Sequence, residues 1–134
     1  MLKGKIKLKG DKSISHRIVI FGALSTGNCV IKNLSTCDDV QKTINILKGC
    51  NIKIESKNNE ITIIKGGKFS NHMKKFDCGN SGSTARFMLG LLPSRGINGT
   101  LYGDLSLSSR PMDRIIEPLN QMNIKIKNSD NKLP

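Results

Sequence analysis

The 134-residue sequence contains no tryptophan, one tyrosine and four phenylalanines. Proteins that bind single-stranded nucleic acid stack the bases on aromatic side chains, so this shortage argues against such a function. The longest early apolar run, residues 18–21, is too short to span a membrane or to form the core of a signal peptide. We therefore expect a cytoplasmic protein without a membrane partner.

Patterns typical of metal sites are also lacking. The four cysteines include no Cys-x-x-Cys pair, and His16 and His72 are the only histidines. Nothing in these spacings favours a zinc site, and we expect reduced, mostly buried thiols. His16 is interpreted as a surface or packing residue.

Acidic residues are few: 10 Asp and Glu stand against 22 Lys and Arg, which gives a formal net charge of +12. Such an excess predicts an anionic partner, and nucleic acid is the first candidate. The lysines, however, are spread singly along the chain rather than in one basic block. A small substrate with several phosphate or carboxylate groups fits the charge equally well, so composition leaves both partners open.

In the first half of the chain, helix and strand periodicities alternate in the order βαβαββ. The expected strands cover residues 3–9, 29–33, 52–55 and 61–64, the last two joined by a hairpin turn at Asn58-Asn59. One expected helix has an apolar face formed by Ile14, Ile18, Phe21 and Leu24. The other buries Val40, Ile44 and Leu47 and begins with Asp38 or Asp39 as its cap.

The same order of elements starts again about 70 residues later, which predicts an internal repeat. It contains a strand at 76–78, a helix at 83–92 with Met88, Leu89 and Leu92 inward, and a strand at 100–102. Pro111 opens a helix that carries Ile115, Ile116, Leu119 and Met122; Pro118 should bend this helix, but its apolar face continues and we keep it as one element. Residues 123–126 then repeat the letters of 51–54, before a second turn at 128–131.

The second copy ends at residues 132–134, where the first copy has a further strand. The sequence therefore predicts one complete unit to about residue 67 and a partial second unit over about 68–134. A sheet that lacks its last strand leaves backbone groups unpaired. We thus expect a chain cut short within its own repeat.

The first segment that could carry chemistry is GDKSISHR, residues 10–17, at a strand-to-helix junction. Backbone N–H groups at a helix start can bind an anion, and Lys12 and Ser13 stand beside them. Arg17 lies four residues after Ser13 and so returns to the same helix face, where its planar guanidinium suits a carboxylate or phosphate. A Ser13 that only caps the helix, with Lys12 and Arg17 in solvent, explains the same pattern.

The second segment, DCGNSGSTAR at residues 77–86, stands at the equivalent junction of the second repeat. Gly79 and Gly82 let the backbone approach a ligand closely, and hydroxyl groups surround the expected helix start. The segment is neither a P-loop nor a GxGxxG fingerprint. A tight turn followed by a helix cap is the structural alternative.

The third segment, GDLSLSSRPM at residues 103–112, places Arg110 directly before a helix start. The helix dipole repels a cation there, so an anion shared by Arg110 and the helix end would explain its position. An arginine that points into solvent is the alternative.

GDKSISHR, GNSGSTAR and the GD-x-SLS-x-RPM stretch, in this order and spacing, resemble the N-terminal part of the EPSP synthase (3-phosphoshikimate 1-carboxyvinyltransferase) family. The resemblance runs through the whole chain but covers well under half of the family's length. It implies an α/β (α+β) fold of repeated βαβαββ units, the inside-out α/β barrel of the enolpyruvyl transferases, here truncated. Residues 1–10 would form a strand of the other domain, and residues 11–134 an incomplete substrate-binding domain.

Members of this family transfer the enolpyruvyl group of phosphoenolpyruvate to the 5-hydroxyl of shikimate 3-phosphate, a step of aromatic amino acid biosynthesis. The resemblance implies no cofactor or metal, and a monomeric enzyme at full length. Lys12 would be catalytic and contact both substrates, while Ser13 and Arg17 would hold shikimate 3-phosphate.

For phosphoenolpyruvate, the resemblance implies that Asn80 and Gly82 line the site and that Arg110 binds the anionic groups. Ser83 stands where many relatives carry threonine, which keeps the hydroxyl. The family's acidic proton-transfer residues would lie outside this chain, so we expect the 134 residues alone to have little or no activity.

Two other functions stay open. UDP-N-acetylglucosamine enolpyruvyl transferases share the fold and the donor, but their first motif lacks K-S-x-S-H-R, so Lys12 and Arg17 favour shikimate 3-phosphate. A non-catalytic basic module that binds nucleic acid or an acidic protein is the alternative of another class. Its affinity for nucleic acid should fall steeply with salt and survive the loss of Arg17 or Arg110. We expect the two small molecules as partners, and no nucleic acid.

Overall fold

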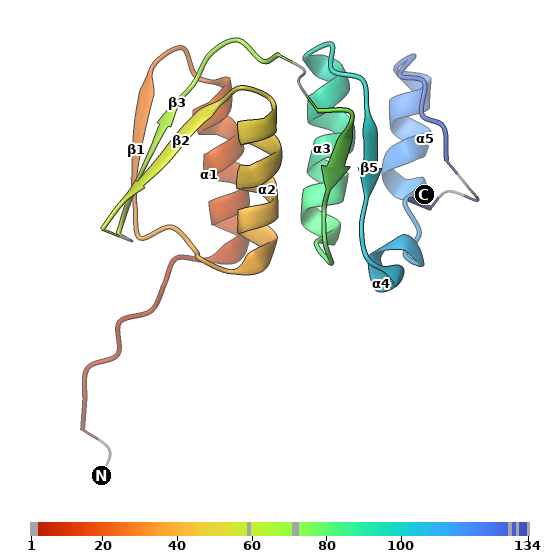
Figure 1. The fold of residues 1–134 in the computed structure, drawn as a ribbon. Helices are drawn as coiled ribbons and strands as arrows, with labels where there is room; N and C mark the ends of the chain where they lie inside the picture. Colours follow the sequence, from red (N-terminus) through yellow and green to blue (C-terminus); the bar gives the residue numbers. More distant parts are fainter. Residues whose placement is uncertain (1–2, 59, 71–72, 129, 131, 134) are drawn as a thin grey trace.

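The computed structural model describes residues 3–58, 60–70, 73–128, 130 and 132–133. Two α/β units lie side by side (Figure 1). The first contains helices α1 (Lys12–Leu24) and α2 (Asp38–Gly49), which cover one face of a sheet made of β1 (Asn28–Lys32), β2 (Lys53–Lys57) and β3 (Ile61–Lys65). The strand order is β1-β3-β2 and both pairings are antiparallel, with Ile64 opposite Cys29 on one side and Ile54 on the other.

The second unit contains β4 (Lys75–Asp77), α3 (Gly82–Ser94), β5 (Thr100–Tyr102), α4 (Leu105–Ser108) and α5 (Asp113–Gln121). β4 and β5 pair in parallel, with Phe76 opposite Leu101. Apart from the expected first strand at residues 3–9, which does not form, the expected order of strands and helices is confirmed as far as α5. The short α4 was not expected; it forms because Asp104 caps it, accepting a hydrogen bond from the Leu107 N–H at 2.7 Å.

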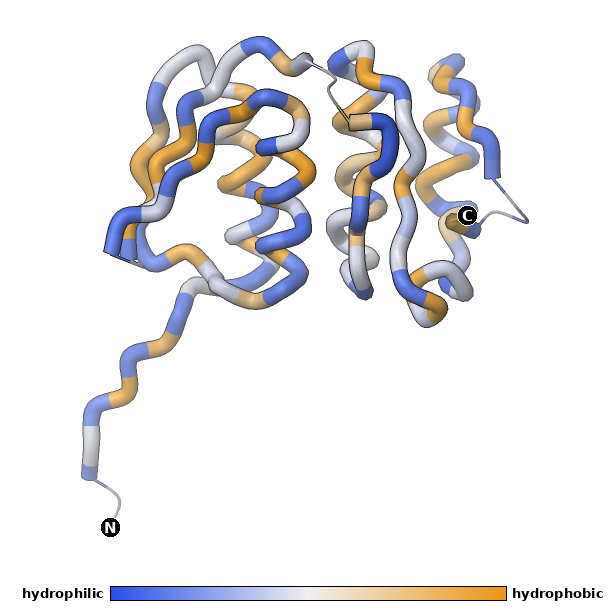
Figure 2. Tube along the Cα trace, viewed as in Figure 1, coloured by the Kyte–Doolittle hydropathy of each residue, from blue (hydrophilic) through white to orange (hydrophobic). Residues whose placement is uncertain are grey.

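One apolar core runs through both units. Its fully buried members include Val19, Val40, Leu47 and Ile64 from the first unit and Phe76, Met88, Leu107 and Met112 from the second. Figure 2 shows that apolar stretches recur along the helices and strands of both units. Burial of one such side chain contributes about 1.5–3 kcal/mol, so the core supplies most of the driving force for folding.

Residues 3–9 do not form the expected strand. They extend away from the body of the molecule (Figure 1), and Ile6 and Leu8 are 85% and 75% exposed. The segment joins the first unit at its end, where the Gly10 N–H donates to the Asn33 carbonyl at 3.0 Å. A strand forms only where a neighbouring strand accepts and donates its hydrogen bonds, and no strand of the described residues lies beside this segment.

The buried face of α1 also differs from the expected one. Ile14 and Phe21 are 65% and 68% exposed, and Ile18 is 40% exposed. The residues that α1 buries are instead Ser15, His16, Val19, Gly22 and Ala23. Small side chains on this face allow close packing: a Cβ added to Gly22 would lie 3.1 Å from Cδ1 of Ile64 on β3.

Smaller corrections concern the ends of the other helices. Cys37 precedes α2 as its cap residue without a side-chain bond, so Asp38 and Asp39 lie in the first turn and not at the cap. Met122 follows α5 and is 70% exposed, so it does not share the buried face of Ile116.

α5 runs unbroken across Pro118, as the continuing apolar face predicted. Residues 124–128 form no strand, although they follow the repeated letters. The expected turns at Asn58-Asn59 and at 128–131 include residues 59, 129 and 131, which lie outside the described residues.

The repeated tetrapeptide proves to be a helix terminator. Asn51 after α2 and Asn123 after α5 both adopt left-handed backbone conformations, with φ of 69° and 63°. In each case the next isoleucine N–H reaches back to a leucine carbonyl, from Ile52 to Leu47 at 3.1 Å and from Ile124 to Leu119 at 3.0 Å. Both helices therefore end in the same Schellman-type motif, which supports the internal repeat at the level of the backbone.

Replacing Asn51 by alanine should destabilise the protein by about 1 kcal/mol, because alanine tolerates the left-handed conformation less well than asparagine or glycine. Asn51→Gly should stay within a few tenths of a kcal/mol of the original. Urea unfolding measures both, with Asn45→Ala at an exposed position inside α2 as the control. An Asn51→Ala variant as stable as Asn51→Gly would contradict the assignment of this helix end.

Candidate functional site

The three sequence motifs meet at one end of the molecule, where α1, α2, α3 and α4 begin (Figure 1). The cap of α1 is Asp11, which accepts from the Ile14 N–H at 2.8 Å, so Ser13 is not the cap and stands in the first turn. The cap of α3 is Ser81, which accepts from the Thr84 N–H at 3.1 Å. Helix starts gathered at one edge attract anions, because their dipoles place positive charge there.

Lys12 lies at this edge with its Nζ 2.9 Å from Oδ2 of Asp39 in α2. The hydrogen bond from Lys12 to Asp39 raises the pKa of the lysine, so it stays a charged ammonium at neutral pH. Its side chain is 51% exposed and can therefore be reached by a ligand. Asp39 holds the ammonium in place while no other anion does.

Arg17 returns to the face of Ser13, as the spacing predicted. Its guanidinium donates to the Ser13 carbonyl at 2.9 Å and lies over the Phe87 ring of α3, 5.4 Å from the centroid. The aromatic face and the carbonyl together fix the direction of an exposed arginine. Its remaining N–H groups suit a planar or tetrahedral oxyanion.

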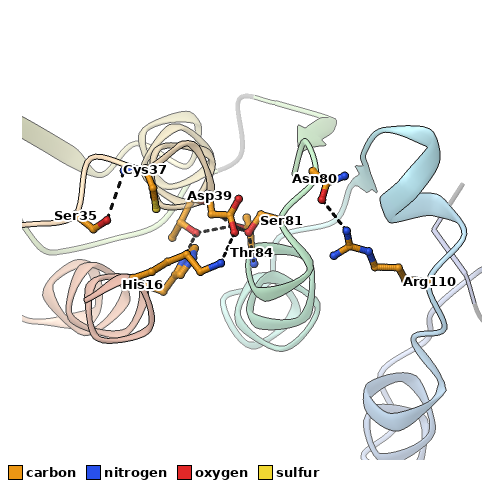
Figure 3. Close-up of polar contacts among 10 residues, drawn as sticks. His16, Ser35, Cys37, Asp39, Asn80, Ser81, Thr84 and Arg110 are labelled. Carbon is orange, nitrogen blue, oxygen red and sulfur yellow. Dashed lines mark hydrogen bonds and ion pairs between the residues drawn. The ribbon is translucent and has the colours of Figure 1, made fainter. Parts of the chain in front are cut away.

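The second and third motifs are joined through Asn80. Its side-chain oxygen accepts from Arg110 at 2.6 Å (Figure 3). Its side-chain nitrogen donates to Oδ2 of Asp104 at 2.7 Å. The hydrogen bond from Asn80 is the main cause that lowers the pKa of Asp104, with a smaller contribution from the charge of Arg110. Asn80 thus lies between a carboxylate and a guanidinium, and both of its polar ends are oriented.

Gly82 is the first residue of α3, and its missing side chain leaves room for two arginines. A Cβ there would lie 2.7 Å from Nη1 of Arg86 and 3.4 Å from Nη1 of Arg110. Arg86 was not predicted from the sequence as a site residue. It follows Gly82 by four residues, as Arg17 follows Ser13, and this spacing could have found it.

The first and second motifs are linked through the start of α2. The carbonyl of Asp39 accepts from Oγ1 of Thr84 at 3.1 Å, while its carboxylate holds Lys12. Thr84 in turn lies 2.8 Å from Oγ of Ser81, the residue after Asn80. The structure therefore brings together all six residues that the sequence singles out: Lys12, Ser13, Arg17, Asn80, Gly82 and Arg110.

An ion pair fixes the loop that carries Asn80. Lys42 of α2 pairs with Asp77 at the end of β4, and Asp77 also accepts from the Gly79 N–H at 2.8 Å. Gly79 has a φ of 55°, and a Cβ there would lie 2.7 Å from Cε of Lys42. The hydrogen bond between Lys42 and Asp77 raises the pKa of the lysine and lowers the pKa of the carboxyl.

Metal and thiol chemistry find no support in the part of the chain that the structure describes. No group of three or more His, Cys, Asp or Glu side chains there could hold a metal ion. Cys50 and Cys78 are buried, and burial raises the pKa of their thiols to about 11 and about 12, which makes them unreactive. Among the same residues, no helix is long and apolar enough to cross a membrane.

The fold defines the class of protein. Solved structures titled EPSP synthase from Acinetobacter baumannii match it with TM-scores of 0.89 and 0.90 at 31% and 32% identity. The first match covers 98% of this chain and 31% of that one. The architecture is therefore a fragment of the enolpyruvyl transferase fold, as expected.

The sequence comparisons agree. The family model of EPSP synthase (3-phosphoshikimate 1-carboxyvinyltransferase) matches residues 1–134, and the chain belongs to this family. A 3-phosphoshikimate 1-carboxyvinyltransferase of Oceanobacillus iheyensis is 44% identical over 138 residues, which cover 99% of this chain and 32% of that protein. The protein of the same name from Bacillus licheniformis is 42% identical over 127 residues, 93% of this chain and 30% of its own length. The chain thus spans about a third of the length of these relatives.

Replacing Lys42 by methionine should lower the free energy of unfolding at pH 7 by about 0.5–1 kcal/mol, the range for partly exposed ion pairs. Because the pKa of Asp77 lies below its ordinary 3.8, the pair contributes fully above that value, and its contribution is lost as the pH falls through the lowered pKa. The difference between the original and Lys42→Met should therefore shrink on acidification. Urea unfolding from pH 7 to pH 3 measures it.

The control for this experiment is Lys48→Met, at an exposed lysine in the last turn of the same helix. Its effect on stability should not change with pH over this range, because Lys48 forms no ion pair with a carboxylate among the described residues. A constant difference for Lys42→Met down to pH 3 would show that the ion pair with Asp77 does not contribute.

Proposed function

We propose that this chain provides the face that binds shikimate 3-phosphate, and part of the face that binds phosphoenolpyruvate, in a 3-phosphoshikimate 1-carboxyvinyltransferase. The observation that carries the proposal is the convergence of Lys12, Arg17, Arg86 and Arg110 on helix starts at one end of the molecule. The family membership of the chain supports the choice of substrates.

The reaction requires such a surface because both substrates are strongly anionic. Shikimate 3-phosphate and phosphoenolpyruvate together carry two phosphates and two carboxylates, and their approach costs Coulomb repulsion. Cations held in fixed positions offset this repulsion, and they do so more strongly when closure of a second domain excludes water. The net charge of +12 thus has a chemical use at this edge, although many lysines are simply solvated.

In the proposed reaction, the 5-hydroxyl oxygen of shikimate 3-phosphate bonds to C2 of phosphoenolpyruvate and loses its proton, while C3 gains one. The tetrahedral adduct then breaks its C2–O bond to phosphate, and C3 gives up a proton to restore the double bond. Lys12 contacts both substrates beside the reacting oxygen and is the catalytic group of this chain. Ser13 and Arg17 hold shikimate 3-phosphate.

The phosphoenolpyruvate side of the site is formed by Asn80, Gly82 and Arg110. Arg110 already points to Asn80 next to the start of α3, and Gly82 leaves space for an oxyanion between the guanidinium and the helix. Arg86 adds a second cation at the same place. A bound carboxylate or phosphate would replace the contacts that Asn80 now makes with Arg110.

Proton transfer in this scheme needs groups that this surface does not offer. Among the carboxylates at this edge, Asp39 is engaged by Lys12, Asp104 by Asn80 and Asp11 by the Ile14 N–H, and His16 is buried. We propose that the acid and base come from the facing domain of the full-length enzyme, with residues 1–10 belonging to that domain and residues 11–134 to an incomplete substrate-binding domain. The exposed, extended course of residues 3–9 supports this division.

Replacing Arg17 by leucine in a protein of full family length should weaken the binding of shikimate 3-phosphate at least about tenfold, because a charged hydrogen bond is worth about 1.5–3 kcal/mol. Calorimetry measures the affinity. Arg95→Leu is the matched control, since Arg95 also lies over an aromatic ring, 5.9 Å from the Phe69 centroid, but at the opposite end of α3. Equal effects of the two variants would contradict the role of Arg17.

The same titration separates the alternative ligands. Binding of UDP-N-acetylglucosamine in place of shikimate 3-phosphate would assign the chain to the related transferase. Binding of nucleic acid that falls steeply with salt and survives the loss of Arg17 would favour the basic module.

The purified 134-residue chain should release little or no phosphate from a mixture of shikimate 3-phosphate and phosphoenolpyruvate, because it offers part of the binding surface without the proton-transfer groups. A steady-state phosphate assay measures this. The comparison is a relative of full length under the same conditions. Turnover near that of the relative would show that the acid and base lie within this chain.

A further inference from the structure

A chain of buried hydrogen bonds joins α1, α2 and α3 behind the site (Figure 3). Nδ1 of His16 lies 2.8 Å from Oγ1 of Thr43, which lies 2.9 Å from Oγ1 of Thr84. Thr84 also lies 2.8 Å from Oγ of Ser81 and 3.1 Å from the carbonyl of Asp39. His16, Thr43 and Thr84 are 0% exposed and Ser81 is 1% exposed, so no bulk water competes for these bonds.

Each hydrogen bond uses one proton, so these contacts determine which atom donates in the bonds between His16, Thr43 and Thr84. The Thr84 hydroxyl has a single proton, which it donates to the Asp39 carbonyl or to Oγ of Ser81, so its oxygen accepts from Thr43. Since the hydroxyl proton of Thr43 is used for Thr84, its contact with His16 needs the proton on the imidazole. Nδ1 of His16 therefore carries a proton, and in the neutral imidazole Nε2 is an acceptor.

Nε2 of His16 has no hydrogen-bond partner among the described residues, although it is fully buried. A buried polar atom left unpaired costs stability, and an apolar side chain of similar size would avoid this cost. The Phe87 ring of α3, with its centroid 6.0 Å from that of the imidazole, shows that the surroundings accept an aromatic group. The presence of a histidine at this position is therefore better explained by the hydrogen bond that its Nδ1 donates than by packing.

The surroundings keep the imidazole neutral. Burial lowers the pKa of His16, and the positive charges of Lys12 and Arg17 on the same helix act in the same direction. Only Asp39 of α2 favours the protonated form, and the ring faces Phe87 on α3. His16 should thus titrate with a midpoint below the ordinary 6.5 of a histidine.

We propose that His16 is a positioning residue that fixes the first motif relative to the second. Its Nδ1 donor sets the hydroxyl of Thr43, and through it the hydroxyls of Thr84 and Ser81, which directly follows Asn80. The same bonds hold the Asp39 carbonyl, and so set the carboxylate that holds Lys12. His16 thereby acts on groups that meet both substrates without touching either.

The location of the proton can be tested on the 134-residue chain itself. Histidine labelled with 15N should show the Nδ1–H tautomer for His16 at pH 7 and a titration midpoint below 6.5, with His72→Gln used to assign the two signals. An Nε2–H tautomer, or titration with an ordinary midpoint near pH 6.5, would overturn the proposal. This measurement does not depend on the proposed function.

The positioning role rests on the proposed function and is tested at full family length. His16→Phe keeps the ring but removes the donor, and should raise KM for both substrates or lower kcat by about tenfold. His16→Asn restores a donor near the position of Nδ1 and should stay within about twofold of the original. Thr43→Val removes the next hydroxyl in the series of hydrogen bonds. The double variant with His16→Phe should therefore lose little more activity than either single variant.

Two results would overturn this role. One is a His16→Phe protein that melts at a lower temperature but keeps its kinetic constants, because the histidine would then be structural only. The other is fully additive effects of His16→Phe and Thr43→Val. If the His16→Phe protein does not fold, the kinetic constants of the Thr43→Val protein are compared with those of the original. Unchanged constants would then contradict the proposal. An original protein that turns over neither substrate would instead refute the proposed function.

Discussion

The first two turns of α2 are the constraint on which the site depends. Asp39 holds Lys12 of α1 and the Thr84 hydroxyl of α3, and Thr43, four residues later, lies on the same helix face between His16 and Thr84. Lys42 reaches across to the end of β4. A single helix therefore sets the positions of two segments that are far apart in sequence, and the site depends on α2 more than on either motif's own local structure.

A surface that attracts anions must also remain stable without them. Lys12 is paired with Asp39, and Arg110 with the Asn80 oxygen, so both cations have a partner within the protein. Both contacts are at least partly exposed, and such contacts contribute little to stability, so a ligand could replace them at low cost. The buried hydrogen bonds behind them are different, because breaking those would leave polar atoms without water. The exposed contacts of Lys12 and Arg110 can thus be exchanged on binding, while the buried hydrogen bonds keep the helices in position.

Sequence patterns predicted the order of the elements from α1 through α5 and the inward face of α3, because both depend on local periodicity or on a repeat. That the three motifs serve one site was implied by the family resemblance and not by periodicity. The face of α1 could not be read in this way. Its apolar stripe containing Ile14 and Phe21 is exposed, while small and polar residues such as Gly22 and His16 are buried by close packing and by partners on other helices. Hydrophobic periodicity is a local pattern, so it does not predict that a histidine is buried against Thr43 of another helix. For the same reason it does not show whether residues 3–9 have a neighbouring strand to pair with.

The repeat also shows how one backbone plan serves two chemical purposes. By the offset that relates Asn51 to Asn123, Asp38 at the start of α2 corresponds to Arg110, which lies just before α5. In the first unit, carboxylates occupy the first helical turn, where the dipole favours them and where Asp39 can hold a lysine. In the second unit the helix begins later, and the equivalent position carries a guanidinium that turns to the start of α3 instead. Shortening one helix by a turn thus exchanges an internal counter-ion for a cation that can meet a ligand.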